Sequence, residues 1–190
     1  MARRPGQHHR RHEHQRRRRH PLPRELRGEI NPRQPAAVPR EPAESPQTDV
    51  AGTWTESTPD TAVKFSAVAY FFGRDLRRAR KVPVGLINSS VGGTPAEAWT
   101  SRAAVAAVPE LKQLLEPPPP NSPASKSKRP KAPGCLYNGM IAPMGPYGIR
   151  GAVWYQGETN ADEPAGYEEL LGALMASWRS QFGSGLPFLV

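Results

Sequence analysis

Four polar side chains follow the most distinctive apolar run of the chain. Residues 149–155 are rich in apolar, β-branched and aromatic side chains and are bounded by glycines, and Gln156, Glu158, Thr159 and Asn160 come directly after them. Such a run is typical of a central strand that is buried on both faces of a sheet. Because ligands bind outside the carboxyl ends of strands in open α/β sheets, a site is expected at these side chains. The alternative is a strand followed by an ordinary polar turn.

A second candidate for chemistry is the glycine pair Gly92 and Gly93. It follows residues 82–89, which we predict to form another parallel strand, and it precedes Thr94 and Glu97, which fit a capping box at the start of a helix. Backbone N–H groups at such a helix start can bind a phosphate or a developing oxyanion. The alternative is a tight turn between a strand and a helix.

The motifs of nucleotide binding and of the nucleophile elbow are absent from this second loop. It contains neither Gly-x-Gly-x-x-Gly nor a Gly-Lys-[Ser/Thr] sequence. Asn88 stands where Gly-x-Ser-x-Gly requires a glycine, so neither Ser89 nor Ser90 lies in an elbow. We expect the strands at residues 82–89 and 149–155 to run parallel with their carboxyl ends at one edge, which would bring Gly92 close to Gln156.

Helices are predicted on both sides of these strands. Thr58 is a candidate N-cap with proline next to it, and apolar residues at helical spacing continue to Leu76, before a basic C-terminal end. Residues 101–116 predict two short helices, interrupted by Pro109. The clearest amphipathic helix covers residues 167–182, and we interpret its aromatic residues, Tyr167 included, as core. Residues 186–190 predict a further strand, at which the sequence ends.

The amino-terminal residues 1–46 have a composition unlike that of the rest. Residues 1–40 contain twelve Arg and three Glu, so the whole net charge of +9 lies there, and residues 41–190 are neutral. A segment dense in Arg, His and Pro cannot bury enough apolar surface to offset its ordering entropy, so we predict a disordered tail. It could contact phosphates, bind metal through its histidines, or result from translation outside the proper frame. Nucleic-acid binding is disfavoured because no aromatic residue for base stacking lies between the arginines.

Other segments limit the function further. Residues 117–133 are a proline-rich insertion that we predict to be disordered, with docking to a proline-binding domain as an alternative. The single cysteine, Cys135, excludes an internal disulfide and a cysteine-based metal cluster. No run of about 18 apolar residues predicts a membrane span. No apolar segment of a secretory signal occurs in the first twenty residues, and no localisation is predicted.

Four strings resemble blocks of the sialate O-acetylesterase family, a branch of the SGNH-type esterases. They are FSAVAYFFGR (65–74), GLINSSVGGTPAEAW (85–99), LYNGMIAPM (136–144) and WYQGETN (154–160). The resemblance covers residues 50–190 apart from the insertion. It implies an α/β fold, a three-layer α/β/α sandwich with a parallel, flavodoxin-like sheet. It also implies hydrolysis of acetyl esters on sialic acid or related sugars, without a cofactor or metal.

The resemblance also implies roles for particular residues. Gly92 or Gly93 would contribute an oxyanion-hole N–H group, and the side-chain amide of Gln156 would be a second donor. Glu158 and Asn160 would support the loop by hydrogen bonds. The loop at residues 135–148 would approach the substrate side, where Asn138 could bind a sugar. Asn138 could equally form an Asx-turn before Gly139.

The sequence departs from the family in its catalytic blocks. The family's nucleophile lies in a Gly-Gln-Ser-Asn block and its base is a histidine near the carboxyl terminus. Here Gly6 and Gln7 continue into His8, and all five histidines lie within the first twenty residues. No catalytic residue is therefore identifiable, and we expect an incomplete, truncated copy that is inactive alone. The alternatives are a non-catalytic carbohydrate-binding relative and a nucleic-acid-binding protein that acts through its tail. Members of the family are often exported.

Overall fold

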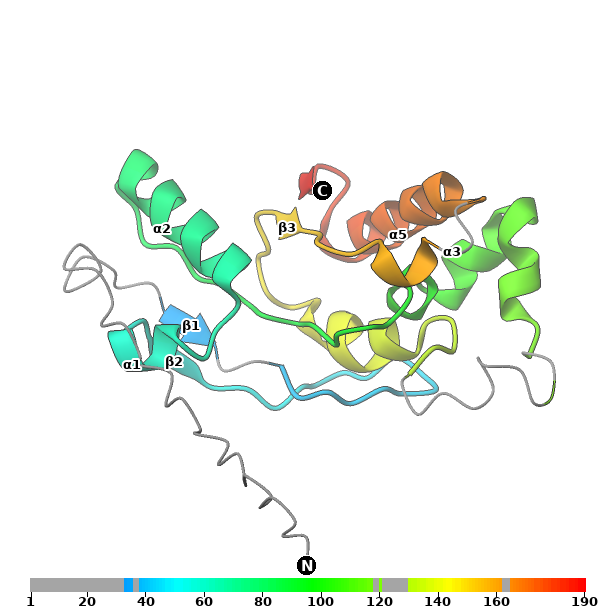
Figure 1. The fold of residues 1–190 in the computed structure, drawn as a ribbon, viewed down its shortest axis with the longest axis horizontal. Helices are drawn as coiled ribbons and strands as arrows, with labels where there is room; N and C mark the ends of the chain where they lie inside the picture. Colours follow the sequence, from blue (N-terminus) through cyan, green and yellow to red (C-terminus); the bar gives the residue numbers. More distant parts are fainter. Residues whose placement is uncertain (1–32, 36–37, 118–119, 121–129, 162–164) are drawn as a thin grey trace, which may run out of the picture.

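A computed structural model describes residues 33–35, 38–117, 120, 130–161 and 165–190 (Figure 1). Most of the predicted tail and most of the proline-rich insertion lie outside these residues. Helical elements are α1 (Pro59–Ala62), α2 (Ala67–Arg80), η2 (Ala96–Trp99), α3 (Arg102–Ala107), η3 (Pro109–Leu115), η4 (Tyr137–Ile141), η5 (Ala142–Met144), η6 (Glu158–Asn160) and α5 (Tyr167–Phe182). The strands are β1 (Arg33–Pro35), β2 (Trp54–Glu56), β3 (Ala152–Val153) and β4 (Phe188–Leu189).

The described strands form two small sheets. β1 and β2 pair antiparallel, and β3 and β4 pair parallel with Ala152 opposite Phe188 and Val153 opposite Leu189. The parallel pair and the surrounding helices make this an α/β chain. The two strands of the pair are far apart in sequence, and the connection between them contains α5, as expected for a parallel crossover.

The strand predicted at residues 82–89 is not formed. The segment is extended, but among the described residues its backbone makes a single hydrogen bond to another segment, from the Val38 N–H to the Asn88 oxygen at 3.0 Å. A strand exists only where a neighbour completes a hydrogen-bond ladder, and none of the described residues does so here. The prediction that residues 82–89 form a strand parallel to residues 149–155 was therefore wrong. Of that second run, only Ala152 and Val153 are in a strand.

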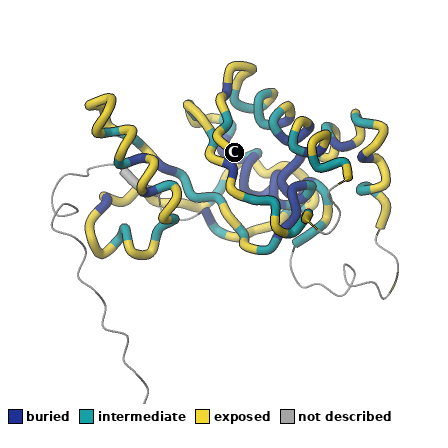
Figure 2. Tube along the Cα trace, turned by 45° about the horizontal axis from the view of Figure 1, so that its top comes forward, coloured by how far each residue is buried: buried dark blue, intermediate teal, exposed yellow. Residues whose placement is uncertain are grey.

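The predicted helix starting after Thr58 is divided into two. Thr58 caps α1 through a capping box with Thr61, and Ser66 caps α2 by accepting the Ala69 N–H. α2 projects from the body, as Figures 1 and 2 show, and its buried residues are Tyr70 and Gly73. A Cβ at Gly73 would lie 2.7 Å from the Leu86 side chain, so the missing side chain allows α2 to pack closely on the extended segment.

The other helix predictions agree better with the structure. α5 covers the predicted residues 167–182, and two short helices, α3 and η3, follow Ser101. The segment at residues 135–148, predicted as a loop, instead forms consecutive helical turns that include η4 and η5. Within the described residues, no helix combines the length and apolarity needed to cross a bilayer.

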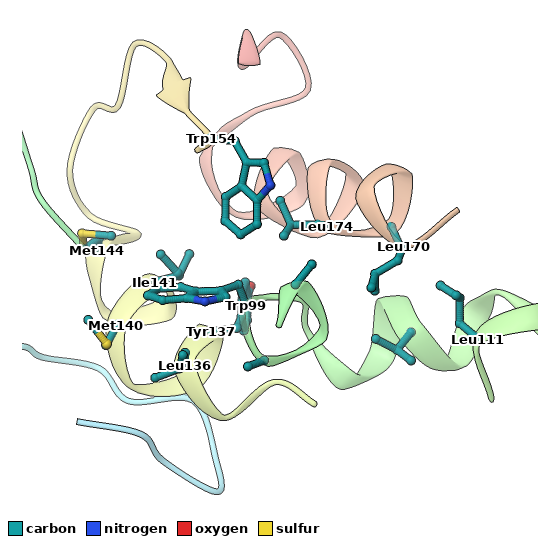
Figure 3. Close-up of a cluster of buried hydrophobic side chains, with 14 of the residues drawn as sticks. Trp99, Leu111, Leu136, Tyr137, Met140, Ile141, Met144, Trp154, Leu170 and Leu174 are labelled. Atoms are coloured by element: carbon teal, nitrogen blue, oxygen red, sulfur yellow. The ribbon is translucent and has the colours of Figure 1, made fainter. Parts of the chain in front are cut away.

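The core lies between α5, η2 and the turns at residues 135–144 (Figure 3). Its largest fully buried side chains include Leu111, Leu136, Met140, Ile141 and Leu174. Trp154 packs edge-on against Trp99 at 6.4 Å and against Trp178 at 6.0 Å between ring centroids. This aromatic packing connects β3 to η2 and α5, and so places the residues that follow β3 beside the start of η2.

An arm of residues 38–47 packs on the opposite side of η4, which corrects the predicted end of the disordered tail at residue 46. Val38 is buried, the Ala43 N–H donates to the Cys135 oxygen at 2.9 Å, and the Gln47 N–H donates to the Asn138 oxygen at 2.9 Å. A Cβ at Gly139 would collide with the backbone of Glu41. The arm is held by backbone hydrogen bonds, which its polar composition does not reveal.

Candidate functional site

The loop after β3 and the loop before η2 are joined by the amide of Gln156. Its Nε2 donates to the Asn160 Oδ1 at 2.7 Å and to the Thr94 backbone oxygen at 3.3 Å. The first of these hydrogen bonds is short, whereas the second lies beyond the usual N–H···O range. The structure thus brings the two predicted site loops together, although of the two strands expected to precede them only β3 is formed.

Asn160 connects the same two loops through both ends of its amide. Its Oδ1 accepts the Ala96 N–H at 3.0 Å, and its Nδ2 donates to the Glu97 Oε2 at 3.1 Å. A backbone N–H can only donate, so the oxygen of Asn160 must face Ala96, and the nitrogen of Gln156 must then face that oxygen. The orientations of both amides are therefore determined by one backbone group.

Asn160 also replaces the predicted capping box of Thr94 and Glu97. η2 begins at Ala96, after Pro95, and no capping hydrogen bond from a side chain of its own N-cap residue is made. Thr94 instead donates its hydroxyl to the Val91 oxygen at 2.7 Å and accepts the Trp99 Nε1–H at 3.0 Å. Thr94 fixes the turn, and the buried N–H at the helix start is satisfied by Asn160.

The turn that Thr94 closes contains both candidate glycines. Gly93 has φ of 70°, in the left-handed region that favours glycine, and Gly92 is exposed. Gly92 has no side chain to cover its backbone, and a Cβ added at this position would meet no atom within 4 Å. The turn therefore leaves its backbone accessible next to the Gln156 amide.

Tyr167 is a member of the site that the sequence analysis assigned to the core alone. Its hydroxyl lies 2.9 Å from the Gln156 Oε1 and 3.3 Å from the Gln156 backbone oxygen. Because the Gln156 nitrogen faces Asn160, its Oε1 is the acceptor and the tyrosine is the donor. The sequence feature that could have indicated this role is the position of Tyr167 at the first turn of α5, after a loop that contains Gln156 and Asn160.

Two predicted site residues, Glu158 and Asn138, do not make the contacts expected of them. The Glu158 side chain is exposed, and no hydrogen bond from it to another described residue is found, so the support expected from it is not seen. Asn138 is buried, and its Nδ2 donates to the Ala43 and Glu44 oxygens at 3.2 and 3.0 Å. That amide anchors the amino-terminal arm, so neither a sugar contact nor an Asx-turn accounts for it.

The site thus gathers hydrogen-bond donors at the end of a parallel strand. It has an exposed glycine turn and an amide donor, groups that can donate to a negatively charged oxygen. Histidine is absent from residues 21–190, so no imidazole base accompanies these donors in the described residues. The fold is that of an α/β protein in which two amide side chains and an exposed glycine turn lie close to the end of a parallel strand.

A sequence model of the carbohydrate esterase family described as sialic acid-specific acetylesterase matches residues 40–190. The chain belongs to this family. It is 38% identical over 142 residues to the sialate O-acetylesterase of Rattus norvegicus, a match covering 63% of this chain and 26% of the rat protein. The Homo sapiens sialate O-acetylesterase is 38% identical over 121 residues, with 63% of this chain and 22% of the human protein covered.

A solved structure has a similar fold. The crystal structure of a carbohydrate acetylesterase from Xanthomonas citri superposes with a TM-score of 0.70 at 35% identity, covering 84% of this chain and 33% of that one. The chain therefore spans about a quarter of the curated rat relative and a third of the solved one. The family match begins at residue 40, ten residues before the start of the resemblance seen in the sequence, and it includes most of the packed arm.

Proposed function

We propose that this chain supplies the oxyanion-stabilising part of a carbohydrate O-acetylesterase site that acts on acetyl esters of sialic acid or a related sugar. The observation that carries the proposal is the geometry of Gln156. One amide hydrogen is held firmly by Asn160, and the other is held loosely by the Thr94 oxygen at 3.3 Å. A loosely bound donor can turn to a stronger, charged acceptor at little cost.

The surroundings favour this use of the amide. Tyr167 holds the Gln156 Oε1, and Asn160 holds the other amide hydrogen. The loosely held hydrogen is therefore positioned before an ester binds. Gly92 leaves the neighbouring backbone open to a ligand. A preorganised donor aimed at a developing charge is usually the largest single contribution to catalysis in acyl transfer.

We also propose the fold of the domain and the part of the protein that supplies the remaining catalytic groups. We place β3 and β4 in a parallel sheet within a three-layer α/β/α sandwich of the flavodoxin type, spanning residues 50–190 with the arm packed against it. The nucleophile and the base come from outside residues 21–190, because this part of the chain has no Gly-Gln-Ser-Asn block and no histidine. Without a positioned base a serine hydroxyl is a poor nucleophile at neutral pH.

A direct assay tests whether the nucleophile and the base lie outside residues 21–190. The purified 190-residue chain is incubated with 9-O-acetylated sialic acid and with 4-methylumbelliferyl acetate, and released acetate or fluorophore is measured. We expect no hydrolysis above the rate in buffer. Hydrolysis by this chain that Ser90→Ala abolished would contradict the assignment, because it would identify a nucleophile within the described residues.

A chimera tests the role of Gln156. Residues 40–190 replace the matching third of the Xanthomonas citri esterase, whose other residues remain. In a chimera that hydrolyses the acetyl esters, Gln156→Ala is expected to lower kcat roughly a hundredfold, the usual effect of losing one oxyanion donor. Lys64→Ala, an exposed residue between α1 and α2, is the matched control and should leave kcat unchanged. An unchanged kcat for Gln156→Ala would refute the donor role.

A further inference from the structure

The carboxylate of Glu97 and the backbone N–H of its neighbour Ala96 face the two ends of one amide. The Asn160 Nδ2 donates to the Glu97 Oε2 at 3.1 Å, and the Asn160 Oδ1 accepts the Ala96 N–H at 3.0 Å. An ionised carboxylate can only accept and a backbone N–H can only donate. A flipped Asn160 amide would therefore lose both hydrogen bonds and place like groups against each other at both ends.

Glu97 lies on a firmly held turn. Its backbone oxygen accepts the Gly134 N–H at 2.9 Å, and both of its neighbours, Ala96 and Ala98, are fully buried. A side chain on an anchored backbone holds its partner in a defined direction, because fewer of its own bonds are free to rotate. The orientation of the Asn160 amide is thus imposed from η2, although Asn160 itself belongs to η6.

The orientation of Asn160 is passed on to Gln156. The Gln156 Nε2 donates to the Asn160 Oδ1 at 2.7 Å, and the Gln156 Oε1 accepts the Tyr167 hydroxyl at 2.9 Å. The hydrogen bonds run in one direction, from Tyr167 to Gln156, then to Asn160 and then to Glu97. Hydrogen bonds in such a chain strengthen one another. An ionised carboxylate has no hydrogen to donate, so this chain of donors ends at Glu97.

We propose that Glu97 is a positioning residue for the oxyanion donor. Its carboxylate selects the Asn160 orientation in which the amide oxygen faces Gln156, and this fixes the direction of the second hydrogen of the Gln156 amide. With Asn160 flipped, two amide nitrogens would face each other and that of Gln156 would turn away. The inference rests on the proposed oxyanion role of Gln156, and it adds the residue that holds this donor in place.

A swap of donor and acceptor between positions 97 and 160 tests the proposal. In Asn160→Asp, two carboxylates meet where the hydrogen bond lies now, so the Gln156 amide should lose its fixed direction. In the double variant Glu97→Gln with Asn160→Asp, the amide nitrogen at position 97 can donate to the carboxylate at position 160. That carboxylate can still accept the Ala96 N–H and the Gln156 Nε2. The pattern is then restored with the partners exchanged.

Exchange of the Gln156 side-chain amide protons with water, measured by NMR in the 190-residue chain, is the first readout, and it needs no esterase activity. Exchange should be roughly fivefold faster or more in Glu97→Ala and Asn160→Asp, the usual effect of one hydrogen bond, and close to wild type in the double variant. Glu110→Ala, at an exposed carboxylate of η3, is the matched control and should change nothing.

The double variant keeps this test valid where a single variant unfolds, because recovery requires the exchanged hydrogen bond. Exchange as fast in the double variant as in Asn160→Asp would overturn the proposal. So would unchanged exchange in Glu97→Ala.

Kinetics in the chimera with the Xanthomonas citri esterase separate this proposal from the one on which it rests. Glu97→Ala should lower kcat roughly tenfold with KM unchanged, less than Gln156→Ala, because the donor is misdirected and not removed. The double variant should recover kcat. If Gln156→Ala lowers kcat and Glu97→Ala does not, the positioning role is wrong and the oxyanion role stands. If Gln156→Ala leaves kcat unchanged, the oxyanion role is refuted, and amide exchange alone decides whether Glu97 orients Gln156.

Discussion

The side-chain oxygen of Asn160 accepts the backbone N–H of Ala96 at 3.0 Å, although 64 residues separate the two along the chain. Ala96 is fully buried in the intact chain, and its N–H loses this hydrogen bond if the side chain is removed. Asn160→Ala should therefore lower the free energy of unfolding by about 1–3 kcal/mol, the cost of a buried unsatisfied donor. Urea denaturation followed by circular dichroism measures the change.

The control for this variant lies two residues away. Glu158→Ala, at an exposed position on the same turn, should change the free energy of unfolding by less than about 0.5 kcal/mol. Equal losses for both variants would show that the turn as a whole, and not the Asn160 amide, secures the start of η2.

The hydroxyl of Tyr167 should determine how firmly the Gln156 amide is held. Tyr167→Phe removes the donor to the Gln156 Oε1 and should lower the free energy of unfolding by about 0.5–1.5 kcal/mol, as for a typical hydrogen bond. The side-chain amide protons of Gln156 should also exchange faster in NMR spectra. Tyr155→Phe, whose ring is mostly exposed, should alter neither quantity. If the exchange of the Gln156 protons stays the same in Tyr167→Phe, the hydroxyl has no positioning role.

Gly139 and Gly172 provide a matched pair of glycine substitutions. A Cβ at Gly139 would collide with the Glu41 backbone, so Gly139→Ala should displace the arm and speed amide exchange at Ala43 and Gln47. Gly172 lies inside α5 with open space around a built Cβ. Gly172→Ala should therefore stabilise the chain by up to about 1 kcal/mol through helix propensity. Unchanged exchange in the arm of Gly139→Ala would mean that the arm does not pack on η4 in solution.

Burial raises the pKa of the Cys135 thiol above its ordinary value, because the buried site disfavours the thiolate. The rate of alkylation by iodoacetamide should therefore rise with a midpoint at higher pH in the native chain than in denaturant. The stability from this group is complete below the ordinary thiol pKa and is lost as pH rises through the folded pKa. A native midpoint at or below that of the denatured chain would contradict the assigned burial.

Helices with a strong local signal could be predicted from the sequence. α5 occupies residues 167–182 as its apolar spacing and Gly183 indicate, and Thr58 caps α1. The two site loops were also expected to meet, and Gln156 does contact Thr94, although the strand expected before the second loop is not formed. These features depend on short-range patterns or on a general rule of α/β folds.

Features that depend on distant neighbours could not be predicted in this way. Residues 82–89 have the composition of a strand, but pairing needs a ladder that composition does not specify. The start of η2 is capped by Asn160 from far along the chain, so the local Thr94 and Glu97 pattern was misleading. The sequence left Asn138 as either a sugar ligand or the start of an Asx-turn, because nothing in residues 38–47 indicates that this arm packs against it.

The contacts of Trp154 with Trp99 and Trp178 also have an optical consequence. Three of the four tryptophans of the chain are within energy-transfer distance of one another in one buried cluster, whereas Trp54 is 42% exposed and lies beside Tyr147. The cluster should emit at shorter wavelength than Trp54 and give a coupled near-ultraviolet dichroism signal. Intrinsic fluorescence therefore distinguishes unfolding of the core from movement of β2 without any added label.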